Sequence, residues 1–238
     1  MKPIWTITKR ELNSFFDSLM AYIMLVLFLG FSGFFTWIQG ADVFFVNQAS
    51  LQSFFSIAYW TLFFFIPALT MRLIAEEKKT GTIEMLLTKP VSERQIIVGK
   101  FLATLLLIAV ALVLTIPYYI TVANLGKVDH GAILFGYLGL ILMSAAYISI
   151  GIFTSSLSNN QIVAFLLALF IGIFFHIIFN VLSNGLPGFA GRISHFLSMS
   201  THFESIARGV FDSKDIIYFL SIIILGLVGS EAVLSKRD

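Results

Sequence analysis

The sequence predicts an all-α membrane protein with six transmembrane helices. Of its 238 residues, 58% are hydrophobic and only 12% are charged, and the mean hydropathy is +0.94. A soluble domain carries about 25% charged residues, so this chain has too few charges to cover a globule of 26.5 kDa in water. Its charge-free stretches are also long enough for spanning helices, which need about 20 apolar residues each. These observations exclude a single soluble domain.

Each predicted span lies in a stretch that has almost no charged side chains. The stretch over residues 130–191 holds two spans, because the polar segment 154–161 divides it. The last span reaches full length only if it includes Glu231, which lies near its end and can reach the membrane interface. The six predicted spans cover residues 19–38, 51–72, 101–122, 132–154, 162–182 and 216–234. Together they form one domain over residues 1–238.

The distribution of basic residues predicts the orientation. Eleven Lys and Arg side chains lie before span one, between spans two and three, and after span six, whereas four lie in the loops of the opposite side. Because basic loops stay in the cytoplasm, both termini are expected to be cytoplasmic. The net charge of +2 is too small to indicate nucleic-acid binding, and the absence of cysteine excludes disulfides and thiolate sites.

Residues 1–18 are predicted to form an amphipathic helix ahead of span one. Trp5 and Phe16 belong to its apolar positions, which recur at helical spacing, and Lys9 and Arg10 fall on the other face. A helix of this kind lies along the membrane surface. The alternative is a polar extension of span one.

The segment over residues 73–100 predicts two long helices joined by a short crosswise one. Span two is expected to continue as a helix to Lys79, with Gly81 as its stop. Pro90 limits the next helix to two turns, and Ser92 with Gln95 fits a capping box that starts span three. The short helix carries Ile83, Met85, Leu86 and Leu87. Either a partner protein covers these apolar side chains or they pack on the flanking helices of their own chain.

The region over residues 183–215 lies on the external side and is neither clearly polar nor clearly spanning. Glycine and proline interrupt it, and residues 201–204 fit a capping box for a short helix. We expect a lid or re-entrant pair of helices in which Phe189, Phe196 and Phe203 form an external gate. An ordinary surface loop is the alternative.

No catalytic, metal-binding or cofactor-binding pattern occurs in the sequence. The phosphate-binding G-x-x-x-x-G-K-[ST] string is absent, so the chain is not expected to bind ATP or to be an enzyme. His176 is the one ionisable residue well inside a span, and a hydrogen bond to a neighbouring helix is favoured over proton transport. Pro67 and Pro117 are expected to kink spans two and three, and small residues such as Gly151 and Ser155 to allow close helix contacts.

Residues 77–92 resemble the E-x-x-x-G-T-x-E-x-L-L-x-x-P-x-S signature of type-two ABC transporter permeases, the membrane subunits of exporters. The resemblance implies that a separate ABC ATPase, which binds ATP and Mg, docks on the short helix and moves spans two and three. The implied coupling interface consists of Glu77, Gly81, Thr82, Glu84, Met85, Leu86, Leu87 and Pro90. Glu76 or Glu77 is expected to pair with Lys9 or Arg10.

The resemblance also implies a bacterial inner-membrane location and a dimer with a second permease. The opening residues and the length are similar to the gliding-motility permease subunits of Bacteroidetes, in which the second subunit can be a different, permease-like chain with an external domain. The expected function is ATP-driven export linked to gliding motility. The alternative is a mechanotransmitting or scaffolding subunit of a gliding or secretion complex that translocates nothing.

Overall fold

The computed structural model describes residues 2–38, 49–83, 90–210 and 212–236. These residues form helices, turns and irregular segments, and the described part contains six helices long and apolar enough to span a membrane. The predicted all-α, six-span class is therefore confirmed.

The first half of the chain supplies the first three spans. Its helices are α1 (Lys2–Asp17), α2 (Leu19–Trp37), α4 (Gln52–Thr70), α5 (Ala75–Lys79), α7 (Glu93–Val113) and α8 (Ile116–Leu125). Span one is α2, span two runs through α4 into α5, and span three consists of α7 and α8.

The second half supplies the other three spans and a lateral arm. Its elements are α9 (His130–Leu157), α10 (Gln161–Ile173), the π-helical turn η1 (Phe174–Ile178), α11 (Phe179–Gly185), α12 (Gly188–Leu197), α13 (Met199–Ala207) and α14 (Ser213–Ser235). Span four is α9, span five runs from α10 to α11, and span six is α14.

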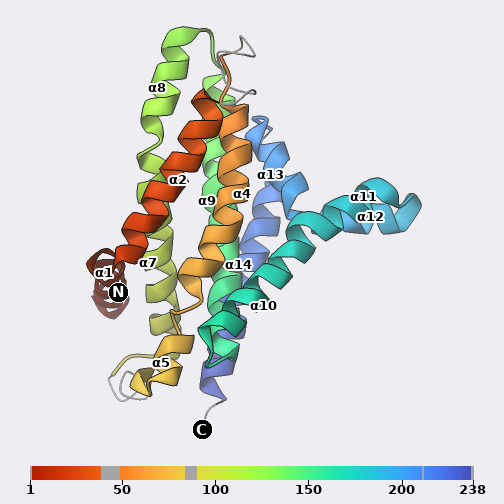
Figure 1. The fold of residues 1–238 in the computed structure, drawn as a ribbon. Helices are drawn as coiled ribbons and strands as arrows, with labels where there is room; N and C mark the ends of the chain where they lie inside the picture. Colours follow the sequence, from red (N-terminus) through yellow and green to blue (C-terminus); the bar gives the residue numbers. More distant parts are fainter. Residues whose placement is uncertain (1, 39–48, 84–89, 211, 237–238) are drawn as a thin grey trace.

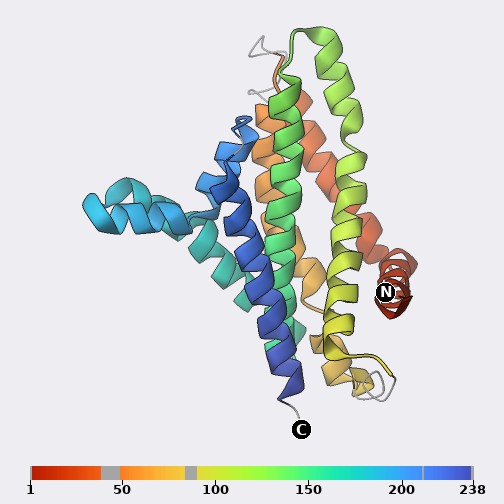
Figure 2. The ribbon, with the colours of Figure 1, turned by 180° about the vertical axis from the view of Figure 1, so that it is seen from behind.

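The spans form an elongated bundle with distinct ends (Figure 1). One end, here called the α5 end, holds α1, α5 and the C-terminal end of α14, and α13 lies towards the opposite end. The α11–α12 pair projects sideways from the bundle, which the view from behind shows equally (Figure 2). Helix α1 and the C-terminal end of α14 thus lie towards the same end of the bundle, and the cytoplasmic placement of both termini stays a prediction.

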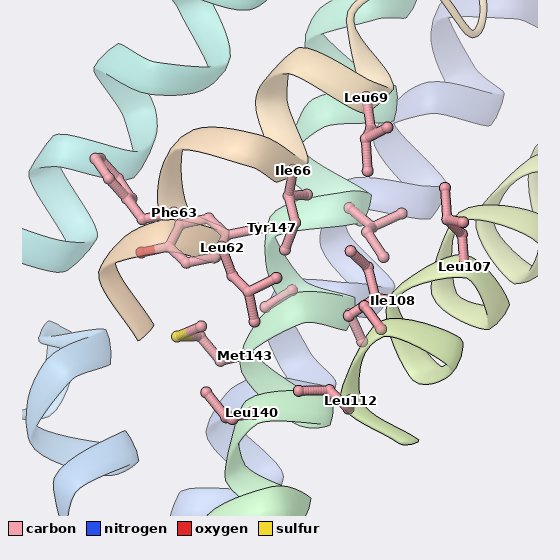
Figure 3. Close-up of a cluster of buried hydrophobic side chains, with 14 of the residues drawn as sticks. Leu62, Phe63, Ile66, Leu69, Leu107, Ile108, Leu112, Leu140, Met143 and Tyr147 are labelled. Carbon is pink, nitrogen blue, oxygen red and sulfur yellow. The ribbon is translucent and has the colours of Figure 1, made fainter. Parts of the chain in front are cut away.

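Helix α9 is the centre of the bundle, since it contacts α4, α7, α10, α13 and α14. Its buried Leu140, Met143 and Tyr147 pack against α4 and α7 side chains such as Leu62 and Ile108 (Figure 3). Small residues permit the closest approaches, as predicted: a β-carbon built on Gly151 would overlap Thr70 of α4.

Span three is interrupted where the proline predicts it. Helix α7 ends at Val113, and α8 begins at Ile116 with Pro117 in its first turn. A proline cannot donate to the carbonyl four residues earlier and its ring crowds that carbonyl. At the interruption, both the hydroxyl and the backbone N–H of Thr115 donate to the Leu112 carbonyl, at 2.7 and 3.0 Å.

Span two differs from the prediction of one continuous helix to Lys79. Helix α4 ends at Thr70, residues 71–74 form turns, and α5 starts at Ala75. The break lies four residues after Pro67, and a polar side chain from α9 fills it, as described below. Gly81 does end the segment, with φ of +72°, a left-handed conformation that glycine adopts without steric cost.

The predicted start of the external helix within residues 183–215 was wrong. Ser198, not Thr201, is the N-cap of α13: its side chain accepts a hydrogen bond from the Thr201 backbone N–H at 3.4 Å. The pattern at 201–204 therefore lies inside the helix. Two short helices, α12 and α13, do precede span six, as expected.

Candidate functional site

Four charged side chains from three elements meet at the α5 end. The ammonium group of Lys100 in α7 lies 2.8 Å from Oε1 of Glu77 in α5 and 3.3 Å from Oε1 of Glu11 in α1. Arg10 lies 2.5 Å from Glu11 and 3.6 Å from the same Glu77 oxygen. We call Arg10, Glu11, Glu77 and Lys100 the ionic cluster. It includes the Arg10–Glu77 pair that the sequence predicts.

The cluster is organised around a buried lysine. The side chain of Lys100 is 1% exposed, whereas that of Arg10 is 48% exposed. Removing a lysine from water is costly unless carboxylates compensate its charge. Burial acts to raise the pKa of Glu11, but Lys100, helped by Arg10, outweighs it and holds that pKa below its ordinary value. The cluster therefore joins α1, α5 and α7 through charges that depend on one another.

A second set of contacts joins the break in span two to α9. The hydroxyl of Ser155 accepts hydrogen bonds from the backbone N–H groups of Ile74 and Ala75, at 3.1 and 3.0 Å, and donates to the Met71 carbonyl at 2.9 Å. One side chain thus satisfies three backbone groups that the helix break leaves open. Lys78 of α5 also donates to the carbonyl of Ser156.

Helix α1 packs closely on the start of α7. The Thr8 hydroxyl donates to the Gly99 carbonyl at 3.1 Å, and Ile7 with Ile96 forms a small buried cluster there. A β-carbon on Gly99 would lie 2.7 Å from a methyl group of Ile7, so this approach requires glycine. The apolar face predicted for residues 1–18 is therefore used partly within the chain, although Trp5 is 61% exposed.

A cavity of about 540 Å³ opens between α1 and α5 beside the ionic cluster. Arg72 lies on its wall, where its guanidinium donates to the Ser18 hydroxyl at 3.2 Å and sits 5.5 Å from the centre of the Phe15 ring. This contact links the junction of α1 and α2 to the break in span two. Helix α5 is consequently tied to α1, α7 and α9 at once.

The predicted coupling residues fall into two groups. Glu77 belongs to the ionic cluster, Gly81 ends the α5 segment, and Thr82 and Pro90 are exposed. Glu84, Met85, Leu86 and Leu87 lie outside the described residues. Ile83 is 3% exposed and packs into the main core, so this apolar side chain is covered by its own chain.

The other predicted residues are distributed as follows. Lys9 is exposed, and the half-buried Phe16 meets Tyr22 edge to face at 6.0 Å between ring centres. Phe189 is 72% exposed, whereas Phe203 is buried against the Tyr59 ring of α4. The ring of Phe196 meets that of Tyr218 in α14 edge to face, with 6.3 Å between the ring centres. Phe203 thus contributes to the core, and these contacts place the three gate candidates in different surroundings.

Sequence reasoning missed Lys100 and Glu11, and it named Ser155 only as a small residue for close helix contact, not as the group that bonds the break in span two. A signal for Lys100 was available, since a lone lysine among the apolar residues 96–103 needs a counter-ion if that part of the helix is buried. For Ser155 there was none: a serine near a helix end usually bonds locally, and its partners are about 80 residues away.

A bundle of six apolar spans, in which α5 between spans two and three is bonded to α1, α7 and α9, defines a multi-pass membrane protein. The family model described as ABC-2 family transporter protein matches residues 41–232. This is more than three quarters of the chain, which therefore belongs to the ABC-2 transporter family. Comparison with curated proteins finds no match.

Membership has direct consequences. The chain is the permease subunit of an ABC transporter, it resides in a membrane, and its working partner is an ABC ATPase.

Proposed function

We propose that this permease exports a substrate across the inner membrane of a bacterium, with the α5 end in the cytoplasm. ATP and Mg are bound by the partner ATPase alone, and this chain is not itself an enzyme. The ATPase docks on residues 73–100, and closure of the ATPases moves α5. A second permease, either another copy or a permease-like chain with an external domain, completes the pathway.

The ionic cluster is the observation that carries this proposal. A coupling segment must transmit the motion of the ATPase to the spans. Helix α5 is bonded to α7 through Lys100, to α1 through Arg10 and the Glu11–Lys100 pair, and to α9 through Ser155. Close-packed helices and buried charge pairs resist gradual deformation. Displacement of α5 therefore moves the ends of spans three and four to which it is bonded, namely the start of α7 and the end of α9.

Docking is tested by co-purification in mild detergent of the full chain with its ABC ATPase. We expect wild type and Lys214→Glu, a charge reversal at an exposed site far from α5, to retain the ATPase. The double variant Glu84→Arg plus Leu87→Asp is expected to lose it while it still elutes as a folded permease. Retention by the double variant would place the contact elsewhere.

A mechanotransmitting or scaffolding subunit of a gliding or secretion complex is the alternative function. It uses the same coupling segment, so the distinction depends on transport itself. Export requires that a labelled compound cross the wall of vesicles that hold the complex, in an ATP-dependent way. The link to gliding motility rests on the resemblance of the opening residues and the chain length, and a deletion strain that glides normally would remove it.

A further inference from the structure

A pocket of about 220 Å³ lies in the half of the bundle away from α5, within a single copy of the chain. It is formed by the first turns of α4, by η1 and α11, and by α13. Its lining combines the aromatic side chains Tyr59, Trp60 and Phe203 with the polar side chains His176, Asn180 and Glu204. Glu204 lies in α13 beside Phe203. Its volume is below the ~300–1,000 Å³ of pockets for drug-sized ligands, so it suits one small head group.

His176 lines this pocket and belongs to the π-helical turn η1. Such turns are rare and are often found at functional sites. The imidazole is 2% exposed, stacks on Tyr59 with 3.9 Å between ring centres, and meets Trp60 edge to face at 4.5 Å. Tyr59 in turn stacks on Phe203 at 4.7 Å. The packing fixes the imidazole in one orientation.

The hydrogen bonds of this histidine leave one polar atom without a partner. Its Nδ1 lies 2.5 Å from the hydroxyl of Tyr147 in α9, and its buried Nε2 has no hydrogen-bond partner among the described residues. If Nδ1 donated, the tyrosine hydrogen and the Nε2 lone pair would both be unsatisfied. If the hydroxyl donates to Nδ1, only the Nε2 hydrogen is left. The second arrangement costs less, so Nε2–H is a free donor.

The charges of the lining restrict what this donor can receive. Among the described residues that line the pocket, Glu204 is the one carboxylate, and the basic side chains Lys and Arg are absent. An anionic head group would meet a carboxylate and no cation. A purely cationic group would bring no acceptor for the Nε2 hydrogen. A neutral group with several hydroxyls can accept from His176, donate to Glu204 and place its C–H face on an aromatic ring.

We propose that this pocket binds a neutral polyhydroxylated ring, such as a single glycosyl head group. The Nε2 atom is covered in the structure, so entry of the ligand requires a side chain to move. Trp60 meets the histidine ring edge to face and, at 44% exposed, is the most exposed of the described aromatic rings that contact it. The site does not depend on the ATPase or on the direction of transport.

The test uses the full chain in phosphatidylcholine nanodiscs, without an ATPase, so that its failure leaves the coupling proposal untouched. Trp5→Phe and Trp37→Phe leave Trp60 as the only fluorophore of its kind. The probes are octyl β-glucoside below its micelle concentration, methyl β-glucoside, octyl trimethylammonium and octyl sulfate. We expect a saturable shift of Trp60 emission with a glucoside and not with the charged heads. A response to both glucosides identifies the head group alone as sufficient, and a response to octyl glucoside only identifies a membrane-borne ligand.

Variants decide whether the response comes from this site. His176→Phe is expected to weaken glucoside binding at least tenfold, whereas His176→Gln, whose amide can donate, stays within about threefold of wild type. The matched control is His130→Phe, because His130 makes a similar contact to a tyrosine, Tyr119, at 2.8 Å outside this pocket. Glu204→Ala, at an exposed position, is expected to weaken binding without unfolding.

The proposal is overturned if neither glucoside gives a saturable response, or if a charged head group gives an equal one. Unchanged affinity in both His176→Phe and Glu204→Ala overturns it as well. Should His176→Phe not fold, as judged by its elution, Glu204→Ala and His176→Gln still carry the test.

Discussion

Gly151 of α9 lies directly against the side chain of Thr70, the residue at which helix α4 of span two ends. A β-carbon on Gly151 of α9 would overlap the hydroxyl and the β-carbon of Thr70, the last residue of α4. One turn further along α9, Ser155 bonds the open backbone of the same break. The closeness of the two helices and the capping of the break therefore depend on each other.

Gly151→Ala is expected to destabilise the protein by about 1–3 kcal/mol, the usual cost of forcing a methyl group into a packed interior. Thermal unfolding in detergent measures this. Gly30 of α2 is the matched control, since nothing lies within 4 Å of a β-carbon built there. Gly30→Ala is expected to be neutral or slightly stabilising, and an equal loss in both variants would contradict the contact with Thr70.

Ser155→Ala removes the group that bonds Ile74, Ala75 and Met71. Buried backbone groups left unpaired cost about 1–3 kcal/mol, so we expect a lower unfolding temperature and faster amide exchange at Ile74 and Ala75. Hydrogen exchange read by mass spectrometry measures the second effect. Ser158→Ala, which removes an exposed local bond near Asn160, is the control and is expected to leave residues 71–75 unchanged.

Glu77→Gln is expected to leave the ATPase bound but to reduce the ATP hydrolysis that the permease stimulates. The amide keeps the size of the side chain but removes the charge that compensates the buried Lys100, so motion of α5 reaches α7 less effectively. Stimulated hydrolysis by the purified complex is the measurement. Glu76→Gln alters an exposed neighbour and is expected to keep wild-type activity. Equal stimulation by both variants would exclude Glu77 from transmission.

The lowered pKa of Glu11 predicts that the folded protein loses stability as the pH falls into the acid range. Its pKa in the folded protein lies below the ordinary 4.5, because Lys100 and Arg10 outweigh the effect of burial. A group of this kind stabilises the fold above its unfolded pKa, and the contribution disappears as the pH falls through the folded value. Wild type should therefore lose more stability than Glu11→Gln below about pH 4.5. Parallel curves of unfolding temperature against pH, measured from pH 7 to the acid range, would contradict this.

A buried pair ties α13 to α14, the helix of span six. Nδ1 of His202 in α13 lies 2.6 Å from Oδ1 of Asp215 in α14, both side chains are under 10% exposed, and Nε2 of His202 lies 2.9 Å from the Phe196 carbonyl. Both ring nitrogens face acceptors, so loss of the carboxylate removes a buried hydrogen bond to a charged group, at a cost of about 1.5–3 kcal/mol. Asp215→Asn is expected to lower the unfolding temperature strongly. Asp212→Asn is the control. Asp212 forms an exposed ion pair with Lys214, and an asparagine there keeps a side-chain oxygen that can accept from the Lys214 backbone N–H, so we expect no such loss.

Local chemistry determined much of this protein. Runs of apolar residues fixed the six spans, since no soluble fold can cover so much apolar surface. Ser92 caps α7 together with Gln95, as its spacing predicts, and Gly81 ends the α5 segment because its φ is positive. Pro117 marks the break of span three. Each of these features depends on residues within a few positions of one another, and a single sequence displays them directly.

Contacts between distant residues were decided only by the tertiary structure. Whether span two continues past Thr70 depends on Ser155, about 80 residues away, because a helix break inside a protein persists only where a partner satisfies its backbone. Lys100 was visible as a charge, but its burial and its two carboxylates came from the packing of α1 and α5 against α7. The sequence analysis assigned Phe203 to an external gate, whereas its side chain is buried in the core. Apolar side chains recur at helical spacing in both settings, so the pattern alone does not distinguish them. Sequence defined which segments enter the membrane, and packing defined how they are joined.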